Sequence, residues 1–181
     1  MIAATGIVFV AMVSLAYSVD TIVTWSLPMV PISLWLNALV GGPLLAAITL
    51  YAAQWRALAG RFGLLLMTVP FIALAANTVV YIVQGMQLGG VANSVVAAAD
   101  LVPHYHTMLL AFALMCFAGC VLAAFTMHTV SREAVAHGGG ELALPKRVLV
   151  RLLVACLLVF AGIFVMRFAF YMMHLTVGLA V

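Results

Sequence analysis

Charged residues are scarce in this sequence, and their scarcity excludes a soluble domain. Of the 181 residues, 6% are charged and 68% are hydrophobic, and the mean hydropathy is +1.32. There are only four acidic residues and three cysteines. This composition is typical of a chain that lies mostly in lipid or packs against helices that do. We therefore interpret the chain as an integral membrane protein.

Several patterns that carry chemistry are also absent. The sequence has no motif for serine-based catalysis, no phosphate-binding loop and no zinc-ligand spacing. Its acidic residues, Asp20, Asp100, Glu133 and Glu141, lie near or outside the expected membrane surfaces, so none is available as a buried proton relay. The cysteines fall inside expected spans, where cysteine is usually a small apolar filler. The net charge of +3 implies no nucleic-acid partner, because the cations act as topology anchors.

What the sequence does contain is a series of five apolar stretches near the ~20 residues that a spanning helix needs. They are residues 1–17, 33–53, 64–85, 104–130 and 148–177. The first stretch is short, about 25 Å long against about 30 Å of hydrocarbon. We predict one all-α transmembrane domain over residues 1–181, a polytopic helix bundle with four full transmembrane helices and a short first one.

The connecting segments indicate the orientation. Two of them hold six of the seven cations: Arg56 and Arg61 in one, and Arg132, Lys146, Arg147 and Arg151 in the other. The other two, residues 18–32 and 86–103, have no Lys or Arg, and the second is expected to hold a short surface helix. Positive residues stay on the cytoplasmic side, which places the N-terminus inside and the C-terminus outside a bacterial cytoplasmic (inner) membrane. All Trp and Tyr residues then lie near a membrane surface, as expected of an aromatic belt.

Arg167 is the one cation expected far from the cytoplasmic end of a span. It lies about 24 Å along the last helix from Arg151, and an ionisable residue in the membrane is a functional candidate by default. His174 follows seven residues later on the same helix face, with Tyr171 between them. A guanidinium, a phenol and an imidazole would suit a quinone head group, so Arg167, Tyr171 and His174 are our quinol-pocket candidates. In the alternative interpretation Arg167 is structural.

In that alternative, which the sequence favours, Arg167 forms an ion pair with Asp20 or Asp100 or caps loop carbonyls, and His174 extends to the membrane interface. The sequence favours no haem or metal site, because His104 and His106 are two residues apart and point to opposite sides of a helix. Asn37, Asn77 and Thr78 are expected to make hydrogen bonds between helices. Pro43 and Pro70 are expected to bend their helices.

Three segments resemble the membrane-anchor subunit of bacterial dimethyl sulfoxide reductase. The first runs from Asp20-Thr21 through Thr24-Trp25 to Gly41-Gly42-Pro43-Leu44-Leu45. The second is Gln84-Gly85 followed by Leu101-Val102-Pro103 and Tyr105, and the third is Arg167, Phe170-Tyr171, His174 and Thr176-Val177-Gly178. Their order and spacing together are fairly specific, although each one alone is weak. The resemblance covers essentially the whole chain.

The resemblance implies a function in anaerobic respiration. Anchors of this family are eight-helix proteins that hold a molybdopterin catalytic subunit and a ferredoxin-like iron–sulfur subunit at the membrane, oxidise menaquinol and carry no haem. Iron–sulfur clusters and molybdopterin would then belong to the partner subunits only, and this chain would be a non-catalytic electron-transfer subunit of the oxidoreductase complex. This chain matches the last five helices, as expected if it begins partway through such a protein. The family's quinol-site His and acidic residue lie on earlier helices and have no counterpart here.

Two other functions remain open at this point. One is a haem-b quinol–cytochrome subunit, which a visible difference spectrum would reveal. The other is a small transporter, which is disfavoured because the two halves of the chain show no internal repeat. The sequence does not indicate the terminal electron acceptor or the side of the membrane on which the partners lie.

Overall fold

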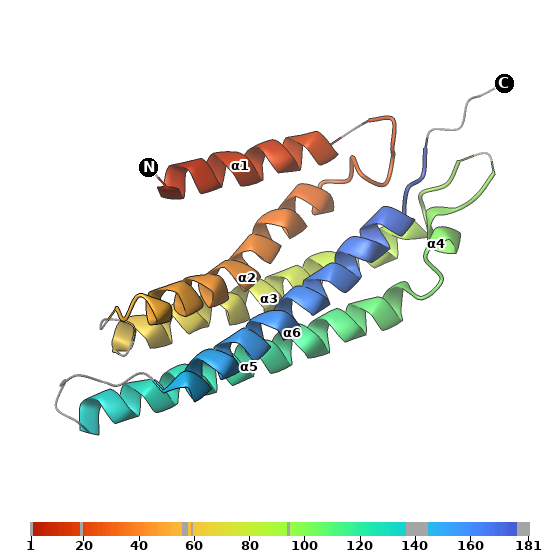
Figure 1. Ribbon diagram of the computed structural model, residues 1–181. Helices are drawn as coiled ribbons and strands as arrows, with labels where there is room; N and C mark the ends of the chain where they lie inside the picture. Colours follow the sequence, from red (N-terminus) through yellow and green to blue (C-terminus); the bar gives the residue numbers. More distant parts are fainter. Residues whose placement is uncertain are drawn as a thin grey trace.

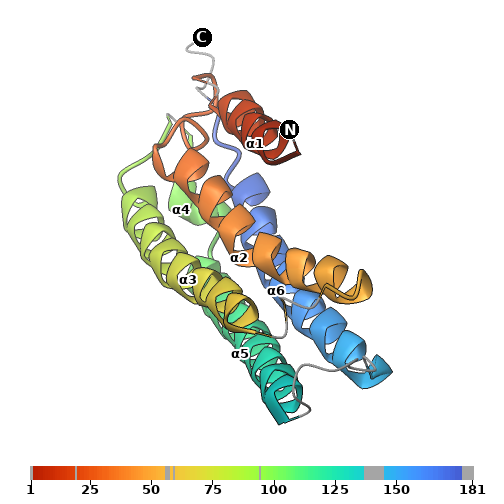
Figure 2. The same cartoon turned by 90° about the vertical axis from the view of Figure 1, so that its left-hand side faces the viewer.

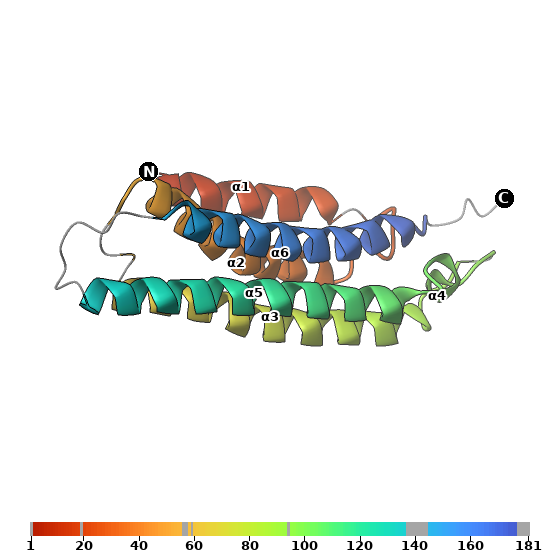
Figure 3. The ribbon, with the colours of Figure 1, turned by 60° about the horizontal axis from the view of Figure 1, so that its bottom comes forward.

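A computed structural model gives the fold and describes residues 2–18, 20–55, 58, 60–93, 95–136 and 145–176. The helices are α1 (Ile2–Tyr17), α2 (Met29–Ala52), α3 (Arg61–Leu88), α4 (Ala98–Leu101), α5 (Tyr105–Ala136) and α6 (Lys146–Met172). The four long helices form an elongated bundle, with α3 and α5 in one layer and α2 and α6 in the other (Figures 1 and 3). The predicted all-α class is confirmed.

Four helices are long and apolar enough to cross a membrane, namely α2, α3, α5 and α6. The 16-residue α1 is shorter, as expected from its sequence. The predicted end of α5 was wrong, since the helix continues past Val130 to Ala136. Hydropathy marks where the chain leaves lipid, whereas backbone hydrogen bonding ends only where the sequence breaks the helix, and residues 131–136 contain no Gly or Pro.

Other helix bounds also differ from those predicted. α2 begins at Met29 rather than at Ser33, because Pro28 and Pro31 fall at the N-cap and in the first turn, where a backbone N–H has no partner within the helix and proline is tolerated. α6 begins at Lys146, and it ends at Met172 rather than reaching the predicted end at residue 177, which lies outside the described residues. α4 confirms the short surface helix expected before Pro103.

Small residues let α5 and α6 pack closely. A Cβ atom added to Gly119 would lie 2.6 Å from the carbonyl oxygen of Ala155, and one added to Gly162 would lie 2.7 Å from Cys116 Sγ. Close backbone approach at glycine is the usual way in which helices associate within a bilayer, where lipid tails are as apolar as the side chains. α2 holds Pro43 within its helix and changes direction along its length in Figure 2, as predicted.

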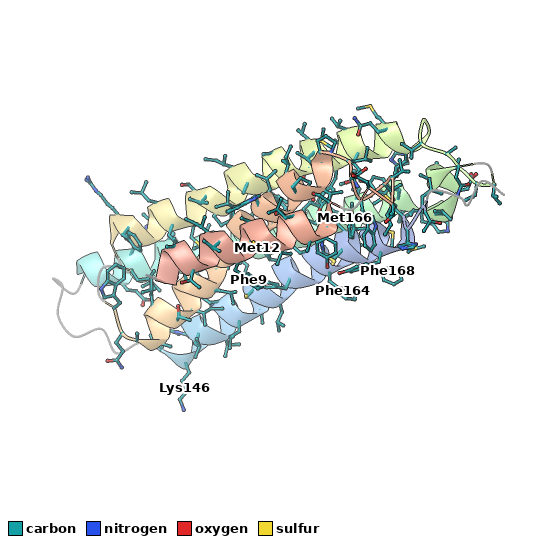
Figure 4. All side chains as sticks on the ribbon, turned by 90° about the horizontal axis from the view of Figure 1, so that it is seen from above. Phe9, Met12, Lys146, Phe164, Met166 and Phe168 are labelled. Atoms are coloured by element: carbon teal, nitrogen blue, oxygen red, sulfur yellow. The ribbon has the colours of Figure 1, made fainter. Side chains whose placement is uncertain are left out.

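α1 lies on the outside of the bundle beside α2 (Figures 1 and 2). Its large side chains are mostly uncovered: Phe9 is 67% exposed, Met12 61% and Leu15 68%, and Figure 4 shows Phe9 and Met12 on this helix. Ser14 is buried and donates its hydroxyl to the Val10 carbonyl oxygen at 2.9 Å, so the helix places no unpaired hydroxyl in lipid at this position. α1 therefore makes few contacts with the rest of the described chain along its length.

Three loop segments meet at the end of the bundle near α4, which we call the α4 end. The segment after α1 pairs with the segment after α6: Val23 N donates to Leu175 O at 3.2 Å, and Thr24 Oγ1 donates to Met173 O. From the third segment, Asn93 Nδ2 donates to Thr176 O at 3.2 Å. Segments predicted to share one side of the membrane are thus tied together, and they are the segments that carry the family resemblance.

Candidate functional site

Arg167 lies among aromatic rings near the last turn of α6. Its Cζ atom is 4.6 Å from the ring centroid of Phe170, 5.1 Å from that of Tyr17 and 6.0 Å from that of Tyr171. A guanidinium over an aromatic face is attracted by the negative face of the ring, and the attraction grows as water is removed. The side chain is half-buried. The rings therefore provide part of the electrostatic stabilisation that lipid cannot give the cation.

The ion pair predicted between Arg167 and Asp20 or Asp100 is not found among the described residues. Asp20 and Asp100 are both exposed. Within the described ranges, neither carboxylate forms an ion pair with Arg167, which is bound by rings instead. Two carboxylates that stay in water keep their hydration, so they gain little from pairing with a cation at this depth.

Tyr17 at the end of α1 and Tyr171 near the end of α6 contact each other at this site. Their hydroxyl oxygens are 2.5 Å apart, within hydrogen-bonding distance, and their rings make an edge contact at 6.3 Å between centroids. This contact connects the last residue of α1 to the last turn of α6. It fixes the end of an α1 helix that is otherwise mostly exposed.

Trp25 completes the group from the segment between α1 and α2. Its indole stacks on Phe170 at 4.9 Å with an interplanar angle of 20°, and Nε1 donates to the Phe170 carbonyl oxygen at 3.3 Å. The His174 ring makes an edge contact with the same indole at 5.2 Å. Trp25 therefore connects the exposed His174 to the rings that surround Arg167.

We call these six residues the Arg167 cluster: Tyr17, Trp25, Arg167, Phe170, Tyr171 and His174. The structure brings all three predicted candidates into one cluster, with His174 joined to the other two through Trp25. Sequence reasoning assigned Tyr17 and Trp25 only to the aromatic belt. The signal that could have identified Trp25 is the resemblance, because the residue stands in one of the segments that carry it.

The cluster offers flat apolar walls together with hydrogen-bonding groups. Guanidinium, phenol and imidazole groups lie at one end of the bundle, close to where the apolar spans end. Sites for small planar ligands typically combine such aromatic walls with a few placed polar groups. The groups present are therefore of the kinds that recognise a planar ring carrying oxygen atoms.

A second polar group lies within the bundle, between α2 and α3. Asn37 Nδ2 donates to the Tyr81 hydroxyl at 2.9 Å, and Asn77 Nδ2 donates to Asn37 Oδ1 at 2.8 Å. This confirms the predicted interhelical role of Asn37 and Asn77. The same prediction was wrong for Thr78, whose hydroxyl donates to the Leu74 carbonyl oxygen of its own helix at 2.8 Å. A threonine can satisfy its hydroxyl in this way inside any helix.

The histidines do not converge. His104 and His106 are both exposed, and His106 makes a ring contact with Tyr105 at 6.1 Å. Across the described parts of the chain, no three His, Cys, Asp or Glu side chains are close enough to hold a metal ion. His137 lies outside these residues.

Cations gather at the end of the bundle opposite the α4 end. Arg61, Arg132, Lys146, Arg147 and Arg151 are all exposed, and Figure 4 shows Lys146 pointing away from the helices. Arg56 lies outside the described residues. Arg167 is thus separated along α6 from the other cations, as the charge pattern predicted.

Comparison with known proteins gives a consistent family assignment. The sequence model of the family described as "DMSO reductase anchor subunit (DmsC)" matches residues 1–173. The chain is 30% identical over 180 residues to the YnfH protein of anaerobic dimethyl sulfoxide reductase from Escherichia coli (strain K12), covering 98% of this chain and 56% of that protein. It is 34% identical over 177 residues to the C subunit of anaerobic dimethyl sulfoxide reductase from the same organism, covering 97% of this chain and 56% of that protein. The chain thus spans about half the length of the curated relatives it matches, and no solved structure matches it.

Proposed function

Because the chain belongs to the family of DMSO reductase anchor subunits, we propose that it anchors a DMSO reductase-type complex in the bacterial cytoplasmic membrane. In this proposal it passes electrons from menaquinol to a ferredoxin-like iron–sulfur subunit, which delivers them to a molybdopterin catalytic subunit. The observation that carries the anchor role is the family match over residues 1–173. Four helices of spanning length support it.

The Arg167 cluster is our proposed binding site for the quinol head group. The exposed Tyr171 ring supplies a flat wall, the Arg167 guanidinium donates to a quinol oxygen, and the exposed His174 accepts a proton from a quinol hydroxyl. Oxidation of menaquinol to menaquinone releases two protons and two electrons. The electrons pass to the iron–sulfur clusters of the partner subunit, and the proposal requires no haem or metal in this chain.

The proposed orientation has the N-terminus inside and the C-terminus outside. The exposed cations at the end of the bundle opposite α4 support it, because positive residues are retained on the cytoplasmic side. The Arg167 cluster then lies near the outer surface of the membrane. Menaquinol diffuses within the bilayer and would reach the cluster from the lipid beside α1 and α6.

The first experiment is purification of the chain from its native membrane, followed by mass spectrometry of the proteins that accompany it. We expect an iron–sulfur protein and a molybdopterin oxidoreductase. Recovery of the chain alone would contradict the anchor role. A haem spectrum in the purified sample would instead favour a quinol–cytochrome subunit.

The second experiment tests the quinol site within the assembled complex. Arg167→Gln removes a charge-assisted hydrogen bond worth about 1.5–3 kcal/mol, so menaquinol oxidation should fall roughly 10- to 100-fold. Arg151→Gln is the matched control, because it removes an exposed cation at the other end of the same helix. Wild-type oxidation rates in an assembled Arg167→Gln complex would exclude the cluster as the quinol site and leave the anchor role standing.

A further inference from the structure

The hydrogen-bond network between α2 and α3 is incomplete. Asn77 is 0% exposed and Asn37 8%. Asn77 Nδ2 donates to Asn37 Oδ1, yet Asn77 Oδ1 has no hydrogen-bond partner among the described residues. It is an unpaired amide oxygen inside a membrane bundle, where neither lipid nor bulk water can satisfy it.

Exchanging the oxygen and nitrogen positions of the Asn37 and Asn77 amides does not supply the missing hydrogen bond. If Asn77 alone were turned, its oxygen would face Asn37 Oδ1 at 2.8 Å with no hydrogen between them. If both amides were turned, Asn37 would accept from the Tyr81 hydroxyl, and the Asn77 amino group would be the unpaired group. Each acceptable assignment therefore leaves one polar group of Asn77 without a partner. Water satisfies either group, since it both donates and accepts.

The surroundings of Asn77 offer a water molecule further partners. Tyr81 follows Asn77 by four residues, so both side chains lie on the same face of α3. Asn77 itself, together with Ser33 and Asn37 from α2, lies around the Tyr81 hydroxyl, and Ser33 is 3% and Tyr81 4% exposed. A buried water typically makes about three hydrogen bonds to groups of this kind. In membrane proteins, ordered water is a usual means of satisfying polar groups within the bundle.

We propose that one internal water molecule binds between α2 and α3, hydrogen-bonded to the Asn77 amide and to the Tyr81 hydroxyl. The site shares no residue with the Arg167 cluster, and the proposal does not depend on quinol binding. The water completes a polar contact between two helices in their apolar spans. Its exchange with bulk water is slow, because Asn77 and Tyr81 are both sealed from solvent.

The direct test is a structure of the intact complex in lipid nanodiscs, determined without quinone and with added menaquinone. We expect density for one water within hydrogen-bonding distance of the Asn77 amide in both. Absence of density in both would overturn the proposal. Density that appears only with menaquinone would also overturn it, because the partner of the Asn77 amide would then be the added quinone.

A second test uses brief X-ray radiolysis, which converts bound water to hydroxyl radicals that label adjacent side chains. Tyr81 and Tyr105 are a matched pair, since each is 4% exposed. Tyr105 donates its hydroxyl to the Tyr81 carbonyl oxygen at 2.8 Å and is not part of the Asn77 network. We expect Tyr81 to be labelled several-fold more than Tyr105, and the difference to be lost in Asn77→Leu. Equal labelling in the wild-type complex would overturn the proposal.

Discussion

Substituting Gly119 should reveal how closely α5 and α6 approach each other. In Gly119→Ala the new methyl group would lie 2.6 Å from the Ala155 carbonyl oxygen and 2.7 Å from Val159 Cγ2. Both contacts are far shorter than van der Waals distance, and neither atom is the end of a flexible side chain. Either the two helices must separate or the local backbone must shift.

The expected cost follows from overpacking, which typically destabilises by about 1–3 kcal/mol. Alanine usually regains up to about 1 kcal/mol over glycine through helix propensity. That gain is small here, because transmembrane segments remain helical in lipid even when they separate. At roughly 2–4 °C per kcal/mol for a chain of this size, the melting temperature should fall by about 2–12 °C.

The measurement is thermal unfolding in detergent micelles, followed by near-ultraviolet circular dichroism of the aromatic residues. Gly42→Ala is the matched control, since an added Cβ at this α2 glycine meets nothing within 4 Å. We expect the control to melt at or above the wild-type temperature. Equal melting temperatures for Gly119→Ala and Gly42→Ala would refute the close α5–α6 contact.

Three further predictions concern the α4 end and the orientation. Tyr17→Phe and Tyr171→Phe should each cost about 0.5–1.5 kcal/mol of unfolding free energy, and the double variant should cost no more than either one, because all remove one hydrogen bond; additive losses would argue against that bond. Asn93→Ala should accelerate amide hydrogen exchange at residues 95 and 96, whose N–H groups donate to Asn93 Oδ1, and unchanged exchange would show that this turn does not depend on Asn93. An impermeant maleimide should label Asp20→Cys on intact cells and Arg132→Cys only after permeabilisation, while the three buried native cysteines stay unlabelled; the reverse pattern would overturn the orientation.

The sequence predicted the number and order of the spanning helices because a long apolar run has few alternatives in a membrane protein. Predicted helix ends were less accurate. Residues 131–136 begin with Ser131, Arg132 and Glu133, and they continue α5 beyond the apolar span. Hydrophobicity records where lipid ends, and it carries no information on how far a helix extends into water.

The candidate site was predicted in part. Arg167 and Tyr171 are four residues apart on one face of α6, so helical periodicity placed them together. The prediction that His174 shares this helix face was wrong, because α6 ends at Met172 and His174 joins the cluster through Trp25. Tyr17 and Trp25 reach the same cluster from distant parts of the chain, at 5.1 Å from the guanidinium and 4.9 Å from Phe170 respectively. Contacts of this kind depend on tertiary packing, which no local pattern encodes. The same packing places Arg167 among rings, where one interpretation of the sequence had paired it with a carboxylate.

The contact between Tyr17 and Tyr171 also has a consequence for biogenesis. The two residues are 154 positions apart, and translation at about 5–20 residues per second separates their synthesis by on the order of ten seconds. During this interval α1 has reached the membrane, but the Arg167 cluster does not exist. A chain that stops before α6 can insert most of its helices, yet it presents no completed cluster. The cluster therefore forms only after α6 has been synthesised, so contacts of residues 20–28 with α6 distinguish chains that contain α6 from chains that stop before it.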